Sequence, residues 1–233
     1  MFTFVCFKWA RNKKGFMLPA AINDYTAEHV NVLGRMLKRH YKKEHRLVCI
    51  TDDPREVECE TIPLWDQCRD LGGCFNRLYV FSKDMRDIIG PRFACIDLDS
   101  VIVSDVTELF NRREDFIINS YNPLPKTRNP PDQRYNGGMF MMNAGARNEV
   151  WTTFDPEKSL RRIRNNPRLC IGSDQAWIRL CLGRNEARWG NADGVYEARQ
   201  VGDTLPDNAK IICFAGARDP SQRKYRWVIN HWR

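Results

Sequence analysis

The sequence predicts an α/β fold in which a mainly parallel sheet is covered by helices on both faces. Three short apolar segments, Phe2–Phe7, Arg46–Thr51 and Arg92–Ile96, have the length and composition of buried strands. Helical patterns at about Tyr25–Tyr41 and Phe75–Arg86 separate them. Apolar strands that alternate with helices pair in parallel, because the connecting helices pack on both faces of the sheet. In such a sheet, ligands bind beyond the carboxyl ends of the strands.

The first helix is predicted from a single apolar face. Val30, Leu33, Leu37 and Tyr41 recur at helical spacing, and Asp24 is the expected cap of the amino end. We therefore expect one side of this helix to pack against the sheet.

The second half of the chain is less regular. Residues Tyr121–Tyr135 include four prolines, which excludes a helix or a central strand there. Phe140–Met142 is a buried apolar run, and Ser173 is expected to cap a helix that continues to Leu182. A last strand begins at Ile211 and runs into a loop with glycine and proline. We find no internal repeat or clear linker, so we expect a single domain over residues 1–233.

Composition limits the size class and the partners. The chain has 233 residues, close to one large domain, since domains usually run to about 100–200 residues. Hydrophobic residues make up 42% of it, which excludes a disordered chain. The net charge of +8 indicates an anionic partner, such as a phosphate compound, nucleic acid or an acidic membrane surface.

The cysteines and the lack of targeting signals predict a cytoplasmic protein. The amino-terminal segment lacks the pattern of a signal peptide, and no stretch approaches the roughly 20 apolar residues of a transmembrane segment. The nine cysteines include no CxxC pair. Cys6, Cys49, Cys95 and Cys213 lie in apolar runs, where a free thiol behaves as a small hydrophobic side chain.

Two carboxylates follow the third predicted strand, in the sequence Asp97-Leu98-Asp99. Because side chains alternate along a strand, we expect Asp97 and Asp99 to share a face and Leu98 to point to the other. Two nearby carboxylates repel each other, and a divalent cation relieves that repulsion. Oxygen ligands suit Mg²⁺ or Mn²⁺, which bridge carboxylates to a diphosphate. The same pattern also fits a strand that simply ends in solvent.

Three later segments place polar residues at the ends of strands or helices. The NGG motif at residues 136–138 precedes the Phe140–Met142 strand, where glycine lets a ligand approach the main chain and asparagine can bond a sugar hydroxyl. Asp174 and Gln175 open a helix, where the helix dipole also stabilises an acid. The loop at residues 213–220 follows the last strand. Each has an ordinary structural explanation, so their order along the chain carries the signal.

In this order the segments resemble the nucleotide-sugar glycosyltransferases of the GT-A fold, close to the glycogenin and lipopolysaccharide-galactosyltransferase group. The resemblance covers roughly residues 2–220. It rests on short motifs, whose specificity lies in their order and spacing. These motifs are Lys8-Trp9, Thr51-Asp52, Arg77-Leu78, the DxD motif Asp97-Leu98-Asp99, Asn136-Gly137-Gly138 and Asp174-Gln175.

The resemblance implies a metal-assisted transfer from a nucleoside-diphosphate sugar, with UDP favoured, and with retention of anomeric configuration. It divides the chain into a nucleotide-binding half at about residues 1–120, a sugar and acceptor half at about 121–220 and a basic aromatic tail at 221–233. Asp97 and Asp99 are the implied ligands of Mn²⁺ or Mg²⁺, and Asp174 and Gln175 the implied catalytic residues. Donor contacts are implied for Lys8, Trp9, Asp52, Arg77, Asp97, Leu98, Asn136 and Gly138.

One part of the family pattern is absent. Cys213 stands where the family has a late metal-binding histidine, and Asp219 replaces a lysine of the same loop. A thiolate is a soft ligand that suits Mn²⁺ and Mg²⁺ poorly. This departure leaves three alternatives: the two aspartates and the diphosphate hold the metal alone, metal binding is weak, or catalysis is lost. Of the four histidines, we expect His29, His40 and His45 to be surface or satisfied residues. The fourth, His231, reaches the site only in the less favoured alternative.

Basic residues gather near positions 35–46, 161–168 and 218–233. The default interpretation is a solvated surface, and the third cluster, interleaved with Tyr225, Trp227 and Trp232, is expected to pack onto the domain. The acceptor stays open: a glycan, a lipid-linked sugar or a nucleic-acid base. A nucleotidyltransferase is a further alternative, although residues 8–15 contain only one glycine. A non-catalytic sugar-nucleotide-binding module is another, because of the missing histidine.

Overall fold

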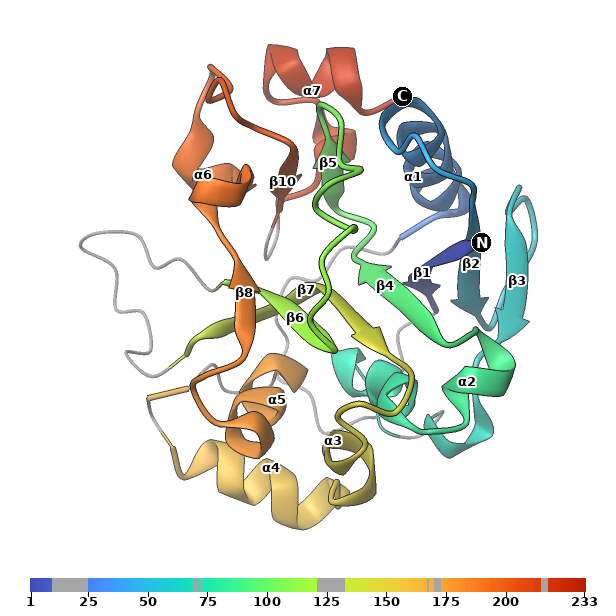
Figure 1. Ribbon diagram of the computed structural model, residues 1–233, viewed down its shortest axis with the longest axis vertical. Helices are drawn as coiled ribbons and strands as arrows, with labels where there is room; N and C mark the ends of the chain where they lie inside the picture. Colours follow the sequence, from blue (N-terminus) through green and yellow to red (C-terminus); the bar gives the residue numbers. More distant parts are fainter. Residues whose placement is uncertain are drawn as a thin grey trace.

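A seven-stranded sheet runs through the centre of the computed structural model (Figure 1). The structure describes residues 1–9, 25–68, 71, 73–120, 133–166, 168–169, 173–214 and 218–233. The strand order is β3-β2-β1-β4-β7-β6-β8. Neighbouring strands are parallel except at β7, which runs antiparallel to both β4 and β6. The predicted mainly parallel sheet is therefore confirmed.

The strands of this sheet are short, and most of their residues are buried. Their bounds are β1 Phe2–Lys8, β2 His45–Thr51, β3 Glu60–Pro63, β4 Arg92–Ile96, β6 Phe116–Ser120, β7 Tyr135–Asn143 and β8 Ala187–Trp189. A second, three-stranded sheet has the order β5-β10-β9. Its bounds are β5 Ser100–Ile102, β9 Val195–Glu197 and β10 Ile211–Cys213.

Helices cover both faces of the central sheet, as predicted. In Figure 1, α1 and α7 lie on one side with the second sheet, and α3, α4 and α5 lie on the other. The α-helices are α1 Ala27–His40, α2 Met85–Ile88, α3 Glu149–Thr152, α4 Pro156–Arg164, α5 Asp174–Leu182, α6 Ala198–Val201 and α7 Arg226–His231. Four 3₁₀ helices are also described: η1 Asp66–Cys68, η2 Gly73–Phe81, η3 Asn191–Asp193 and η4 Pro220–Gln222.

The sheet separates two apolar clusters, because its side chains alternate between the two faces. Along β1, Phe4 and Cys6 enter the cluster on the α1 side, whereas Val5 and Phe7 enter the cluster on the α5 side. Strands buried on both faces read as continuous apolar runs, which explains why β1, β2 and β4 are visible in the sequence.

Three expectations about individual elements need correction. Thr26, not Asp24, is the N-cap of α1, and Asp24 lies outside the described residues. The helix expected at Phe75–Arg86 is the 3₁₀ helix η2 followed, after Ser82–Asp84, by the short α2. Most of the predicted proline loop, residues 121–132, lies outside the described part of the chain.

The cysteines predicted to act as small hydrophobic side chains are buried. Cys6, Cys49, Cys95 and Cys213 are each at most 3% exposed. Cys6 and Cys49 are paired in register on β1 and β2. Burial raises the pKa of Cys6 and Cys95 well above the usual thiol value, so these thiols stay protonated.

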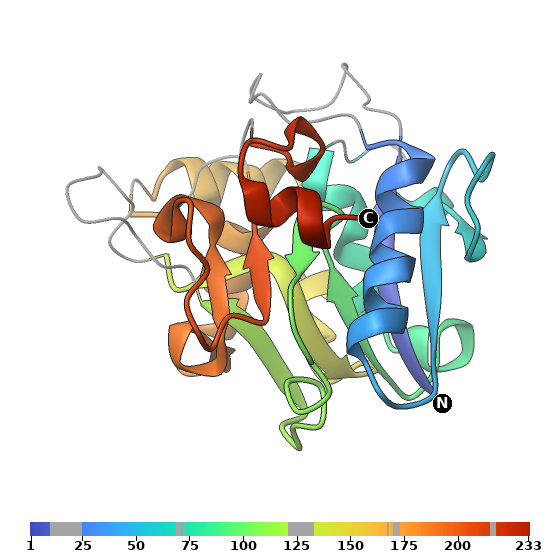
Figure 2. The ribbon, with the colours of Figure 1, turned by 90° about the horizontal axis from the view of Figure 1, so that it is seen from above.

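The basic aromatic tail packs against α1, as expected. Figure 2 shows α7 beside α1. Trp227 and Trp232 are each 5% exposed. The Arg39 guanidinium donates to the carbonyl oxygens of His231 (2.7 Å) and Arg233 (2.5 Å). Among the described residues, no helix has the length and apolar character needed to cross a bilayer.

Candidate functional site

The predicted donor residues lie at the edge of the sheet where β1, β2 and β4 end. Lys8, the last residue of β1, is in register with Thr51, the last residue of β2, and Asp52 follows directly. Asp97 follows β4, the other parallel neighbour of β1. Because β7 is antiparallel to β4, its first residues reach the same edge. The main-chain N–H of Asp97 donates to the carbonyl oxygen of Gly138 at 2.8 Å.

An arginine clamp joins two of the predicted acids. Arg77 on η2 donates from Nη1 to Asp97 Oδ1 and from Nε to Asp174 Oδ2, each at 2.5 Å. The side chains of Arg77 and Asp174 are 9% and 2% exposed, whereas that of Asp97 is 30% exposed. The clamp therefore brings together residues from η2, from the end of β4 and from the start of α5, far apart in the sequence.

Two glycines of β7 leave room for this clamp. A Cβ atom on Gly137 would lie 3.0 Å from Arg77 Nη2 and 3.4 Å from both Asp174 carboxylate oxygens. A Cβ atom on Gly138 would lie 3.2 Å from Asp97 Oδ2. The NGG motif was expected to precede a strand, but it lies inside β7, because pairing with β6 extends back to Tyr135. The two glycines therefore allow the main chain of β7 to lie close to the side chains of the clamp.

Main-chain N–H groups of β7 hold the amide side chains of Asn136 and Gln175. Asn136 Oδ1 accepts a hydrogen bond from the Gly138 N–H at 2.8 Å. Gln175 Oε1 accepts one from the Gly137 N–H at 3.2 Å. Ser173 caps α5, as predicted, and its hydroxyl accepts from the Gln175 N–H. The amino end of α5 is therefore fixed against β7, and the Asp174 carboxylate reaches the clamp.

Asp97, Leu98 and Asp99 form a turn that links the two sheets. β4 ends at Ile96, and the Ser100 N–H donates to the Asp97 carbonyl oxygen at 3.1 Å, so the expected alternation along a strand does not apply here. Leu98 is 1% exposed and lies in the apolar cluster, away from the carboxylates, as expected. Leu98 is therefore a packing residue, and its implied donor contact remains a prediction.

The two carboxylates of this turn influence each other. Asp99 is 7% exposed. Its burial and the charge of Asp97 raise the pKa of Asp99 well above its usual value. Burial also raises the pKa of Asp97, although Arg77 opposes this shift. A cation beside the turn would relieve this repulsion, so the donor set fits a hard divalent metal ion.

Cys213 lies beside Asp99, at the end of β10. It is paired with Ser100 on β5 and is 3% exposed. Burial raises its pKa, so the group is a neutral thiol and a poor ligand for Mn²⁺ or Mg²⁺. Among the described residues, no three His, Cys, Asp or Glu side chains are arranged to hold a metal ion by themselves. A cation would need oxygens from the ligand in addition to Asp97 and Asp99.

The remaining predicted donor residues, Lys8, Trp9 and Asp52, lie at the same edge of the sheet. Lys8 is 7% exposed. The ring of Trp9 is half-buried and packs edge-on against Phe7 at 5.6 Å. Asp52 is exposed, and the neighbouring Asp53 pairs with Arg55 at 2.8 Å. The donor contacts expected for Lys8, Trp9 and Asp52 therefore remain predictions.

Three residues next to Asp99 have no predicted role in the site. Burial and the charges of Asp99 and Asp97 raise the pKa of Tyr25, the residue before the N-cap of α1. His29 was expected to be a surface or satisfied residue. It is 6% exposed and bonds Asp219 at 3.2 Å, so it is satisfied but not at the surface. The sequence offers no signal for this cluster, because its members come from opposite ends of the chain.

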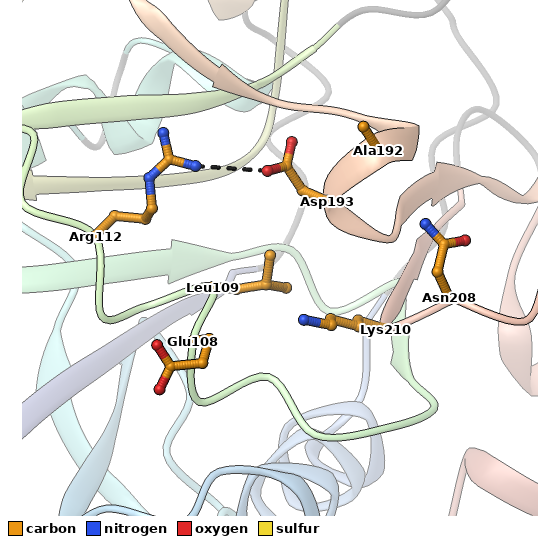
Figure 3. A pocket seen from close by; sticks show the side chains of 7 residues that line it. All are labelled: Glu108, Leu109, Arg112, Ala192, Asp193, Asn208 and Lys210. Carbon is orange, nitrogen blue, oxygen red and sulfur yellow. Dashed lines mark hydrogen bonds and ion pairs between the residues drawn. The ribbon is translucent and has the colours of Figure 1, made fainter.

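A pocket of about 330 Å³ lies elsewhere (Figure 3). It lies between the segment that follows β5 and the residues before β10, with Arg112, Asp193 and Lys210 among its lining residues. Lys210 precedes β10, whereas Cys213 ends it, so this pocket opens at the other end of β10 from Asp99. None of the predicted site residues lines it.

The sequence matches no family model and no curated protein. Among solved structures, the chain is similar to the crystal structure of the galactosyltransferase LgtC in complex with donor and acceptor sugar analogs. The identity is 11% and the TM-score 0.60, and the alignment covers 96% of this chain and 91% of that chain. A likeness at this identity concerns the fold and leaves the reaction to be tested. Together with the sheet order and the helices on both faces, it shows that this chain has the GT-A fold.

Proposed function

We propose that this protein is a glycosyltransferase of the glycogenin and lipopolysaccharide-galactosyltransferase type, which moves a sugar from a nucleoside-diphosphate sugar to an acceptor. The observation that carries the proposal is the convergence of Asp97, Arg77 and Asp174 with the glycines of β7 at the carboxyl edge of a GT-A sheet. The similarity to a galactosyltransferase that holds donor and acceptor sugar analogs supports it. UDP is the favoured nucleotide.

The proposed metal ligands are Asp97 and Asp99, which would hold Mn²⁺ or Mg²⁺ together with the donor diphosphate. When bound, the cation neutralises the charge that develops on the departing nucleoside diphosphate. The raised pKa of Asp99, caused by burial and by Asp97, supports this role, because such a pair gains from a cation. Cys213 is not part of the proposed ligand set.

The proposed catalytic residues are Asp174 and Gln175. Arg77 holds the Asp174 carboxylate, and the Gly137 N–H holds Gln175 Oε1, so both groups are fixed before a donor arrives. A fixed carboxylate and amide beside the anomeric carbon would stabilise its positive charge as the bond to the diphosphate breaks. We propose that the transfer retains the anomeric configuration, which the configuration of the product sugar would test.

The proposed acceptor is a glycan or a lipid-linked sugar, with a nucleic-acid base as the alternative. The α4 region presents the exposed side chains of Arg161, Arg162, Arg164 and Arg168. A nucleic-acid acceptor would bind there or at the tail with an affinity that falls steeply as salt rises. Absence of DNA and RNA binding at low salt would exclude that acceptor.

A catalytically weakened sugar-nucleotide-binding module is the second candidate function. It is favoured by Cys213, whose neutral thiol stands where the family has a metal-binding histidine. The two candidates share donor binding and differ in turnover. Measured binding without hydrolysis or transfer under any divalent cation would favour the module.

A thermal-shift panel of UDP-, GDP-, ADP- and CMP-sugars, with and without Mn²⁺, tests both candidates. A nucleotide at a hundredfold excess over its Kd should stabilise the fold by about 2.7 kcal/mol. Asp97→Asn should abolish the shift that depends on Mn²⁺. Asp105→Asn is the matched control, since Asp105 accepts from the Thr107 N–H at 2.8 Å and lies outside the site. If no nucleotide sugar shifts the midpoint of the wild type, the proposed function is wrong.

A further inference from the structure

The 3₁₀ helix η2 is unusually long and contacts the start of α5. It runs over nine residues, Gly73–Phe81, whereas 3₁₀ runs longer than about three or four residues are uncommon. In a 3₁₀ helix the side chains at positions i and i+3 eclipse, so they leave the helix on the same side. Cys74 and Arg77 have this spacing, and both contact Asp174. The helix therefore directs two side chains at the proposed catalytic acid.

The two contacts hold different parts of Asp174. The Asp174 N–H donates to Cys74 Sγ at 3.3 Å, and Arg77 Nε donates to Asp174 Oδ2 at 2.5 Å. Asp174 is the first residue of α5, so its N–H has no partner within that helix. Cys74 therefore holds the main chain, and Arg77 holds the carboxylate.

The sulfur of Cys74 serves as a hydrogen-bond acceptor. Burial and the charge of Asp174 raise the pKa of Cys74, so the group stays a neutral thiol. Asp174 is 1% exposed. An apolar side chain at position 74 would therefore remove the acceptor of a buried N–H, which is unfavourable because that N–H has also lost its contact with water.

We propose that Cys74 is a positioning residue, and that η2 uses Cys74 and Arg77 together to fix Asp174 for the transfer reaction. This inference rests on the proposed function, which assigns the catalytic role to Asp174. The strand β7 confines the same carboxylate, since a Cβ atom on Gly137 would lie 3.4 Å from both its oxygens. Such confinement matters for rate, because a displacement of about 1 Å can slow a reaction about hundredfold.

Variants of two half-buried cysteines test the inference through Mn²⁺-dependent hydrolysis of UDP-galactose. Cys74→Ala removes the acceptor and should lower kcat about tenfold with little change in KM, because it displaces Asp174 and leaves the nucleotide contacts in place. Cys74→Ser keeps an acceptor at this position and should restore most of kcat. Cys181→Ala is the matched control. It removes a thiol near the other end of α5, where Cys181 Sγ lies 3.9 Å from Thr153 Oγ1, and should leave kcat unchanged.

Hydrogen exchange of the Asp174 amide, followed by NMR, gives a readout that does not depend on turnover. Exchange should be about fivefold faster in Cys74→Ala, the factor expected for the net strength of one hydrogen bond, and close to that of the wild type in Cys74→Ser. The Gln175 N–H donates to Ser173 Oγ at 3.3 Å, so its exchange should not change and serves as the internal control.

The order of the two variants at position 74 decides between positioning and simple packing. A thiol that acts only as a small apolar side chain is replaced better by alanine than by serine. Cys74→Ala at least as active as Cys74→Ser, or an Asp174 amide that exchanges equally slowly in both, would therefore overturn the inference. An equal loss of kcat in Cys74→Ala and Cys181→Ala would also overturn it.

Failure of the inference can be told apart from failure of the proposed function. If the wild type hydrolyses neither UDP-galactose nor UDP-glucose, the exchange of the Asp174 amide decides the inference alone. The proposed function is then judged by the nucleotide-sugar panel. If Cys74→Ala does not fold, Cys74→Val removes the acceptor while filling the space and takes its place.

Discussion

Arg77 is the residue whose removal should disturb this protein most, because it neutralises two acids. In Arg77→Met the side chain keeps a similar reach, but the carboxylate of Asp174, 2% exposed, loses its charged partner. Removing one partner of a buried ion pair costs about 3–5 kcal/mol. We assign nearly all of this cost to Asp174, because Asp97 is 30% exposed and solvent screens its charge.

Urea unfolding of the variant gives the free energy of unfolding, and Arg147→Met is the matched control. Arg147 also bridges two acids, Glu186 at 2.8 Å and Asp115 at 2.9 Å, but the side chain of Asp115 is 58% exposed. Glu186 and Asp115 are 14% and 58% exposed, against 2% for Asp174, so solvent compensates more of the lost partner and we expect this control to lose less stability than Arg77→Met.

The double variant Arg77→Met/Asp174→Asn identifies the cause. Without the charge at position 174, most of the lost stability should return, because no uncompensated charge is then buried. The reasoning is refuted if Arg77→Met loses less than about 1 kcal/mol, or if the double variant is no more stable than the single one. If Arg77→Met does not fold, Arg77→Lys, which keeps the charge and loses the two-sided geometry, serves in its place.

Three further predictions concern the residues around this clamp. Gly137→Ala places a methyl group 3.0 Å from Arg77 Nη2 and should lower the free energy of unfolding in urea by about 1–3 kcal/mol. The control Gly34→Ala, within α1, should raise it by about 0.5–1 kcal/mol. Equal changes in the two variants would contradict the proposed crowding. Burial and the neighbouring carboxylate raise the pKa of Asp99, so the folded state binds its proton more tightly and the stability of the ligand-free wild type falls as pH rises above about 4. Asp99→Asn should therefore be the more stable protein at pH 8 in thermal unfolding, with the difference vanishing near pH 4, and a difference that grows on acidification would exclude this cause. Cys213→Ala should keep Mn²⁺ affinity within about twofold, because a neutral thiol is a poor ligand for a hard cation; a larger loss would return the thiol to the ligand set.

The strands that could be predicted are those with continuous apolar runs. Phe2–Phe7, Arg46–Thr51 and Arg92–Ile96 match β1, β2 and β4 to within one residue at either end. Strands such as β8, with three residues, are too short to show a period of two. β6, Phe116–Ser120, was missed although its first three residues are apolar. The antiparallel direction of β7 has no local signal, since it follows from the pairing with β4 and β6.

Much of the candidate site could be predicted because its residues follow strands or open a helix. Asp97, Asp174 and Gly138 were singled out in this way, and the structure brings them together. The reason for that proximity could not be read from the sequence, because it depends on Arg77 and on the space left by Gly137. The buried pair of His29 and Asp219 was missed because its members are 190 residues apart, and only the folded chain brings them together.

The buried thiols of the central sheet allow local opening of the sheet to be measured by the rate of thiol labelling. A thiol reagent needs an exposed thiolate, and Cys6 and Cys49 are fully buried on adjacent strands. Their labelling rates would measure how often β1 and β2 separate, whereas the half-buried Cys59 and Cys181 would react through smaller fluctuations. Slower labelling of Cys6 when a nucleotide sugar is added would show that a ligand at one edge of the sheet stabilises the strands throughout their length.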